Sequence, residues 1–103
     1  MTEKYLEFLV STKHFAYPID KIREIMEYPL VEPISGAPEP VLGVMNLRGR
    51  LVVVFDIAAL VGEVSANITS KTCVVVTEIE QNGQRVVVAH KVDLVRQVVD
   101  ISR

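Results

Sequence analysis

Few residues in this sequence have the types and spacing that catalysis or metal binding requires. The chain has two histidines, His14 and His90, and a single cysteine, Cys73. A cysteine paired with a histidine can act as a nucleophile, but His14 lies in a polar turn, while His90 ends one apolar run and Cys73 lies inside another. We interpret them as a solvated turn residue, a polar strand end and a small buried hydrophobe.

Motifs for catalysis and cofactor binding do not occur in the sequence. There is no CxxC, HExxH or GxSxG motif and no glycine-rich phosphate loop. The thirteen carboxylates are scattered, and an acid/base pair among them would need a pocket that residue order does not reveal. A small enzyme built around His90 is the weakest interpretation. We therefore predict that the protein is not an enzyme and has no cofactor or metal site.

A different chemical question is raised by the stretch GVMNLRG, residues 43–49, which runs directly into RLVVVFDI. It sets Asn46 and Arg48 beside the apolar residues that look most like core. Turn formation is a sufficient explanation for Asn46 and Gly49. An arginine buried alone is costly to desolvate. Arg48 must therefore reach solvent or meet a carboxylate.

Two upstream glutamates, Glu24 and Glu27, could pair with Arg48. Glu24 lies between Ile22 and Ile25, in a segment whose apolar side must face the body of the protein. It is therefore the better candidate for a partly buried partner. The alternative is that Arg48 is an exposed turn residue without a structural role.

Composition restricts the class of protein. A chain of 103 residues that is 50% hydrophobic and 23% charged is expected to form one globular domain. A net charge of −2 gives no electrostatic footprint for nucleic acid. Apolar runs such as residues 51–55 are far shorter than the roughly 20 residues of a membrane span. With no secretory signal and one cysteine, we expect a cytoplasmic protein without membrane insertion.

Alternating hydrophobicity predicts a mainly β chain with many short strands. Asn82-Gly83, between two β-branched runs, is the strongest hairpin signal, and a second tight turn is expected at Arg48 and Gly49. The pattern is typical of a small β-barrel or sandwich. The expected strands cover residues 4–10, 15–19, 41–47, 50–57, 72–80 and 85–92.

Short helices are expected between the strands. Asp20 is a candidate N-cap for one or two turns, because apolar residues follow at three-four spacing within residues 22–26. In DIAALVG, Asp56 as N-cap and Gly62 as C-cap bracket a helix of about two turns. The segment 93–103 fits a helix and a strand equally well.

Two stretches of the sequence resemble a known family. FAYPIDKIREIM (residues 15–26) and PISGAPEPVLGVMNLRGRLVVVFDI (residues 33–57) resemble the CheW-like domains of bacterial chemotaxis coupling proteins, and the likeness extends from Tyr5 to about Val99. The resemblance implies two interleaved five-stranded barrels of SH3 and OB type. It also implies a non-enzymatic adaptor, which links the cytoplasmic domains of methyl-accepting chemoreceptors to the regulatory domain of the histidine kinase CheA.

The resemblance also implies roles for individual residues. The family's glutamate–arginine pair corresponds to Glu24 and Arg48, and positions that affect receptor coupling correspond to Ile22 and Gly43. We take Ile22, Gly43, Asn46 and Arg48 as candidates for receptor or kinase contact. The alternative is an ordinary structural role, with Ile22 in the core and Gly43 at a strand bend.

Three departures from the family pattern stand out. Val53 replaces a proline, His90 occupies a position where the family has aspartate, and the family continues for several strands where this sequence ends at Arg103. We therefore expect residues 1–103 to form one C-terminally short CheW-like domain whose second barrel is incomplete or completed by a partner chain. A homodimer formed by strand pairing or swapping would cover the unpaired edges.

A rival interpretation is an OB-like barrel that binds a small ligand or an oligonucleotide. Single-stranded nucleic acid requires basic grooves with aromatic stacking platforms. This chain has three tyrosines, three phenylalanines and no tryptophan, and it is net acidic. We therefore predict no nucleic-acid partner.

Overall fold

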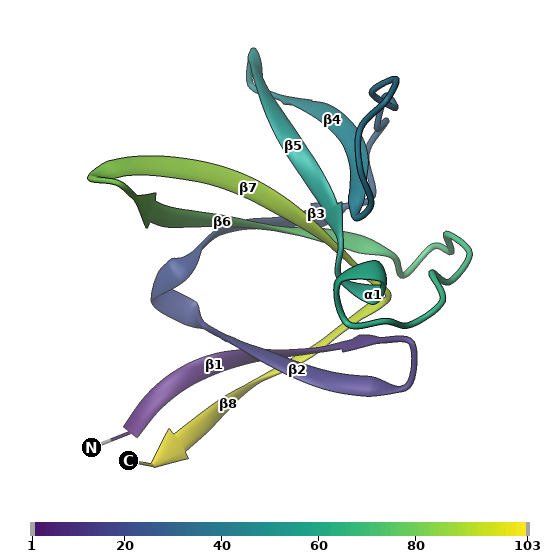
Figure 1. The fold of residues 1–103 in the computed structure, drawn as a ribbon. Coiled ribbons are helices and arrows are strands. Elements are labelled where there is room, and N and C mark those ends of the chain that lie inside the picture. The colour runs from purple at the N-terminus through teal and green to yellow at the C-terminus, as the bar shows by residue number, and fades with distance from the viewer. Residues whose placement is uncertain (1, 103) are drawn as a thin grey trace.

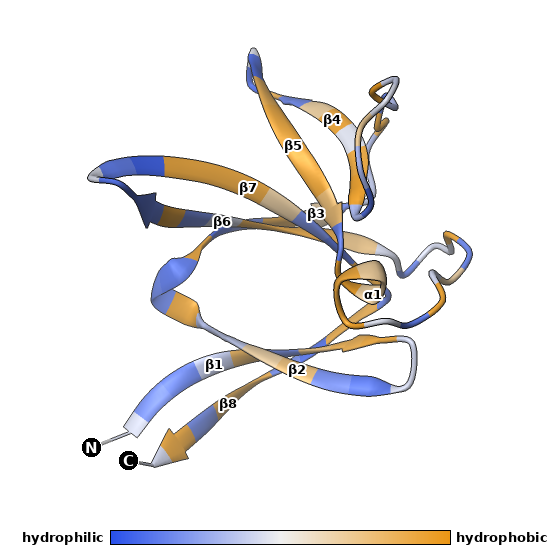
Figure 2. Cartoon of the chain, viewed as in Figure 1, coloured by the Kyte–Doolittle hydropathy of each residue, from blue (hydrophilic) through white to orange (hydrophobic). Residues whose placement is uncertain are grey.

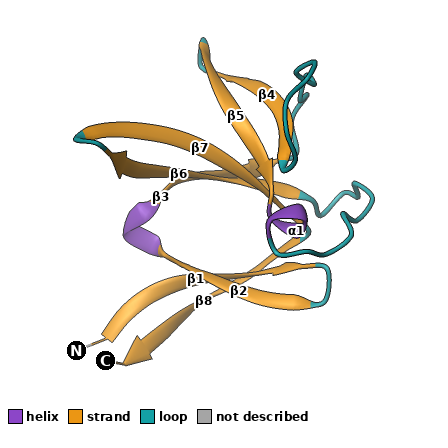
Figure 3. Ribbon diagram, in the orientation of Figure 1, coloured by secondary structure: helices purple, strands orange, loops and turns teal. Residues whose placement is uncertain are grey.

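The computed structural model describes residues 2–102, and these form a mainly β chain, as predicted (Figure 3). The helical elements are the 3-10 turn η1 (Ile19–Lys21) and the short helix α1 (Ile57–Leu60). The strands, labelled in Figure 1, are β1 (Thr2–Val10), β2 (Lys13–Pro18), β3 (Ile22–Glu27), β4 (Val41–Leu47), β5 (Arg50–Asp56), β6 (Cys73–Gln81), β7 (Gln84–Val92) and β8 (Leu94–Ser102).

The strands form two sheets. One has the order β2-β1-β8 and the other the order β3-β6-β7-β5-β4. Every pairing is antiparallel except that of β5 with β7, which is parallel and short. The sheet with fewer strands is therefore the one built from the two ends of the described chain (Figure 1).

The sheets are joined at two corners where the chain passes directly from one to the other. β2 runs through η1 into β3, and β7 is separated from β8 by Asp93 alone. The Ser11 N–H donates to Asp93 Oδ2 at 2.6 Å, and the Asp93 N–H donates to the Leu9 carbonyl at 2.9 Å. Asp93 therefore fixes the corner against the β1–β2 turn.

The β6–β7 hairpin separates two hydrophobic cores. On one face, Val75 and Val92 pack with Phe8 and its neighbours from β1, and the Phe8 ring lies 5.4 Å from that of Tyr17. On the other face the core contains Met45, Val52, Val54, Val74, Val76 and Ala89. Because both faces of the hairpin are covered, β6 carries the continuous apolar run VVV rather than strict alternation (Figure 2).

The two predicted hairpin turns are confirmed. Arg48 and Gly49 have φ of 51° and 85°, and Asn82 and Gly83 have φ of 53° and 78°. Two consecutive residues with positive φ are the mark of the tight turn that matches the right-handed twist of paired strands.

The predicted helix near Asp20 is wrong. Only residues 19–21 are helical, preceded by Pro18 as N-cap, and Ile22–Glu27 forms strand β3 against β6. The three-four spacing of apolar residues is overridden because the edge of β6 offers this segment a full backbone ladder. Glu24 therefore lies on a strand.

The predicted helix in DIAALVG forms after its predicted N-cap, but it has four residues rather than about two turns, and its C-cap is Val61 rather than Gly62. The ambiguous C-terminal segment is resolved. The Asp56 side chain accepts from the Ala58 N–H at 3.1 Å as N-cap of α1, and Gly62 follows the C-cap Val61 with φ of 77°. Residues 94–102 form β8, which pairs with β1.

A substitution at Gly43 tests how closely β4 packs against the backbone of Glu32. Gly43 is buried at a register shift between β4 and β5 and has φ of 154°. A Cβ atom at this position would overlap the backbone carbonyl of Glu32. That carbonyl accepts a hydrogen bond from the Val44 N–H at 2.9 Å. We expect Gly43→Ala to lower the free energy of unfolding by about 1–3 kcal/mol, as overpacking does, measured by urea denaturation.

Gly36→Ala is the matched control for Gly43→Ala. Gly36 also has positive φ, of 78°, but nothing lies within 4 Å of the added Cβ. Equal losses of stability in the two variants would show that the contact with Glu32 is unimportant.

Candidate functional site

An ion pair joins β3, an edge strand of the five-stranded sheet, to the β4–β5 turn. Arg48 Nη1 donates to Glu24 Oε1 at 2.6 Å, from the β4–β5 turn to β3. Since β3 and β4 are the first and last strands of this sheet, the pair spans its open side. The structure brings Arg48 to Glu24 rather than to Glu27.

The pair is mostly solvated. The Arg48 side chain is 72% exposed and that of Glu24 is 27% exposed. The hydrogen bond to Glu24 and the charge of this carboxylate raise the pKa of Arg48 above its usual value. Exposed pairs contribute little to stability because water and salt screen them. The pair therefore contributes little to the free energy of unfolding.

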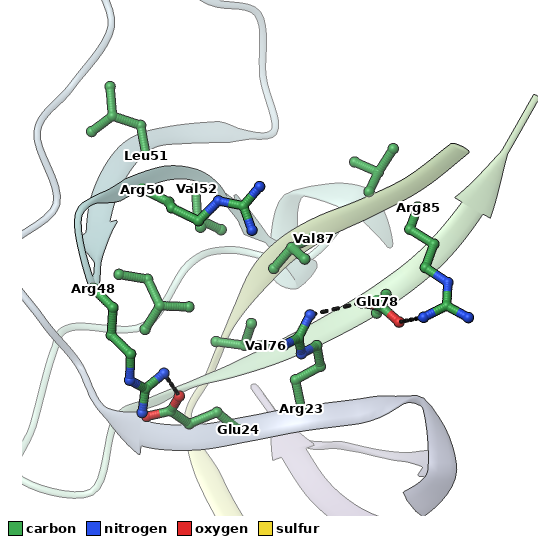
Figure 4. A pocket seen from close by; sticks show the side chains of 12 residues that line it. Arg23, Glu24, Arg48, Arg50, Leu51, Val52, Val76, Glu78, Arg85 and Val87 are labelled. Carbon is green, nitrogen blue, oxygen red and sulfur yellow. Dashed lines mark hydrogen bonds and ion pairs between the residues drawn. The ribbon is translucent and has the colours of Figure 1, made fainter. Parts of the chain in front are cut away.

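Beside this pair lies a hollow of about 610 Å³, which we call the arginine cleft (Figure 4). Its apolar wall includes Val52, Val76 and Val87 from β5, β6 and β7. Its charged residues are Arg23, Glu24, Arg48, Arg50, Glu78 and Arg85. Four arginines against two glutamates make the cleft positive in a chain whose net charge is −2.

The arginines of the cleft differ in their partners. Arg23 Nη1 lies 2.7 Å from Glu78 Oε1, and Arg85 Nη1 lies 3.4 Å from Glu78 Oε2. Glu78 therefore serves two guanidinium groups. Within residues 2–102, Arg50 has neither a hydrogen bond nor an ion pair from its side chain.

The other candidate residues do not line the cleft. Asn46 Oδ1 accepts from the Gly49 N–H at 2.9 Å, so its side chain shapes the turn. Ile22 is half-buried, pairs with Thr77 and packs against the core that contains Phe8. Gly43 is buried. Of the four contact candidates, the structure places only Arg48 in the arginine cleft.

A second hollow, of about 620 Å³, lies on the opposite face of the β6–β7 hairpin, and we call it the junction groove. Its lining includes Tyr17, Ile79, Val88 and His90, with Lys21 and Glu80 among its charged residues. Thr77 also lines it, and Thr77 Oγ1 and His90 Nδ1 are buried without a hydrogen-bond partner in the described part of the chain. The groove lies where η1 joins the two sheets.

The two histidines and the cysteine lie on three different strands, His14 on β2, Cys73 on β6 and His90 on β7. His14 Nδ1 is 2.8 Å from Glu7 Oε2 on an exposed face, and hydrogen bonds from Gln97 and His14 lower the pKa of Glu7. His90 packs 5.6 Å from the Tyr17 ring, and burial lowers the pKa of its imidazole.

Burial likewise raises the pKa of the Cys73 thiol, which disfavours the reactive thiolate. Among residues 2–102 no three histidine, cysteine, aspartate or glutamate side chains gather as metal ligands do. Over the same residues no helix has the length and apolar character of a membrane span.

Comparison with known proteins identifies related sequences and a related structure. The model of the CheW-like domain family matches residues 4–103. The chemotaxis protein CheW of Rhizobium meliloti (strain 1021) is 31% identical over 97 residues, covering 94% of this chain and 60% of that protein. The chemotaxis protein CheW of Klebsiella aerogenes is 31% identical over 85 residues, covering 82% of this chain and 49% of that protein.

A solved structure shares the fold. The scaffolding protein TtCheW from Thermoanaerobacter tengcongensis superposes with a TM-score of 0.87 at 24% sequence identity, covering 99% of this chain and 64% of that one. This chain therefore spans about three fifths of the length of TtCheW and of the Rhizobium meliloti relative.

The exposure of the Glu24–Arg48 pair leads to a prediction about stability. Arg48→Ala, Glu24→Ala and the double variant should unfold at nearly the same urea concentration as the wild type, because a screened pair contributes little. Asp56→Ala is the positive control, since Asp56 is 5% exposed and caps α1, and it should cost about 1 kcal/mol. Strong coupling between the two alanine variants would instead make the pair a structural clamp.

Proposed function

The chain belongs to the CheW-like domain family, and we propose that it works as a non-enzymatic adaptor in chemotaxis-type signal transduction. In this role it would link the cytoplasmic domain of a methyl-accepting chemoreceptor to the regulatory domain of the histidine kinase CheA, within the cytoplasm. The observation that carries the proposal is the family match over residues 4–103, together with relatives that bear the name chemotaxis protein CheW. The description of TtCheW as a scaffolding protein agrees with it.

The layout of the surface suits a protein with two partners. The junction groove and the arginine cleft lie on opposite faces of the β6–β7 hairpin, and Glu78 lines both. A groove with apolar walls such as Tyr17, Ile79 and Val88 is suited to the helical tip of a receptor, which would insert an apolar face. Ile22, opposite Thr77 in the β3–β6 ladder, lies next to this groove.

An oligonucleotide-binding role receives less support. The arginine cleft has the positive charge that phosphates need, but none of its lining residues is aromatic. Stacking on aromatic rings is a main source of affinity for single strands. We therefore retain the adaptor as the proposed function.

Binding assays test the adaptor role directly. A receptor cytoplasmic fragment and the kinase regulatory domain, each immobilised, should both retain the purified wild-type chain. Arg48→Ala should weaken retention by one of the two about tenfold, the equivalent of one charge-assisted contact, and leave the urea midpoint unchanged.

Lys71→Ala is the control, because Lys71 is an exposed cation that lies in a turn and lines neither the arginine cleft nor the junction groove. It should bind both partners as the wild type does. A folded wild-type chain that binds neither partner would contradict the adaptor proposal.

We also propose that two copies of the chain pair through β8. This strand is an edge of its sheet, and it exposes Val98 by 52% and Ile101 by 40%. Unpaired edges with apolar side chains favour strand addition. The wild type should therefore sediment as a dimer at micromolar concentration, and Val98→Lys should convert it to a monomer.

Leu30→Lys is the control for this substitution, since Leu30 is 79% exposed and lies outside the strands. It should leave the dimer intact. A monomeric wild type with cooperative unfolding would rule out pairing through β8.

A further inference from the structure

β5 and β7 leave a wedge-shaped gap between them. They are parallel, and their pairing covers only Val54↔Ala89, Phe55↔His90 and Asp56↔Lys91. Toward the start of both strands the ribbons diverge (Figure 1). The residues on either side of the opening, at the starts of β5 and β7, belong to the lining of the arginine cleft.

The register shows what faces what across this gap. Val54 is opposite Ala89, so counting four residues back along each parallel strand sets Arg50 against Arg85. Counting two residues back sets Val52 against Val87. Figure 4 shows these four side chains on the two strands that border the cleft. The wedge therefore has a row of two arginines at its mouth and a row of two valines deeper inside.

Charge disfavours continuing the β5–β7 ladder to Arg50 and Arg85. Like charges directly opposite each other destabilise a ladder, and Arg50 has no carboxylate partner in the described residues to compensate. The edge of β5 at residues 50–53 and the edge of β7 at residues 84–88 face the cleft without a partner strand in the described chain.

We propose that this wedge binds an extended acidic segment of a partner protein, which inserts as a strand between β5 and β7. One carboxylate of the segment lies between Arg50 and Arg85. A strand presents every second side chain on the same face, so an apolar residue two positions away packs between Val52 and Val87. The recognised pattern is an acidic residue and an apolar residue separated by one position.

Three features of the site favour this occupant over others. Two free edges offer backbone hydrogen bonds on both sides of one inserted strand, which is the usual source of affinity in strand addition. The unpaired Arg50 and the excess of arginine attract carboxylates and repel a basic segment. The valine wall requires an apolar side chain, which a nucleic-acid backbone does not provide. Strand insertion goes beyond the adaptor role, because it states what kind of segment binds, an extended acidic strand, whichever partner protein carries that segment.

Labelled peptides test the proposal with the intact chain. A short peptide with glutamate and valine taking turns at every second position and serine between them, Glu-Ser-Val-Ser-Glu-Ser-Val, carries both side chains on one face. It should bind, as measured by fluorescence anisotropy, and the matched peptide with lysine in place of each glutamate should bind at least about tenfold more weakly. The double variant R50E/R85E should reverse this preference. K71E, which reverses an exposed charge outside both the cleft and β8, should keep it. Equal binding of both peptides, or a preference that R50E/R85E leaves unchanged, would overturn the proposal.

A second measurement separates strand insertion from simple charge attraction. Amide signals of residues 50–53 and 84–88 should shift on addition of the acidic peptide, and N-methylation of alternate peptide amides should abolish binding, since it removes backbone donors. Acidic peptides that bind equally well after N-methylation, or shifts confined to other residues, would contradict insertion. Neither outcome bears on retention by the receptor or kinase fragments, so the two proposals fail independently.

Discussion

Burial on both faces of the β6–β7 hairpin is the constraint on which the rest of the structure depends. Val74 and Val76 face one core, and Val75 and Val92 face the other. All four side chains are fully buried. Full burial of one such side chain stabilises by roughly 1.5–3 kcal/mol. The hairpin therefore holds β3 along one edge, a short stretch of β5 along the other, and the β1–β2 hairpin across its inner face.

The two candidate surfaces are consequences of this arrangement. Because β5 pairs with β7 over three residues only, the five-stranded sheet opens into the arginine cleft. Because η1 turns the chain from one sheet to the other, the junction groove opens on the opposite face. The ion pair across the cleft is exposed and contributes little energy. Stability thus lies in the shared core, and of the charged residues of the cleft only Arg50 has no ion-pair partner among the described residues.

The site could be predicted only in part. The unusual position of Arg48 in an apolar run pointed to a carboxylate, and the geometry brings Glu24 to it. Arg50 and Arg85 gave no signal, because nothing in residue order indicates that β5 and β7 run side by side and in parallel. Glu78 had a weak signal: the Asn82-Gly83 turn fixes the β6–β7 register, which brings Glu78 within reach of Arg85.

The sequence by itself determined the local features, because they depend on neighbouring residues. These are the turns at Arg48-Gly49 and Asn82-Gly83, the capped helix after Asp56 and the mainly β character. Only the tertiary structure decided that residues 22–27 form a strand and that the C-terminal segment joins the sheet of β1. In both segments local periodicity was weak or misleading, and a backbone ladder offered by a strand distant in sequence outweighed it.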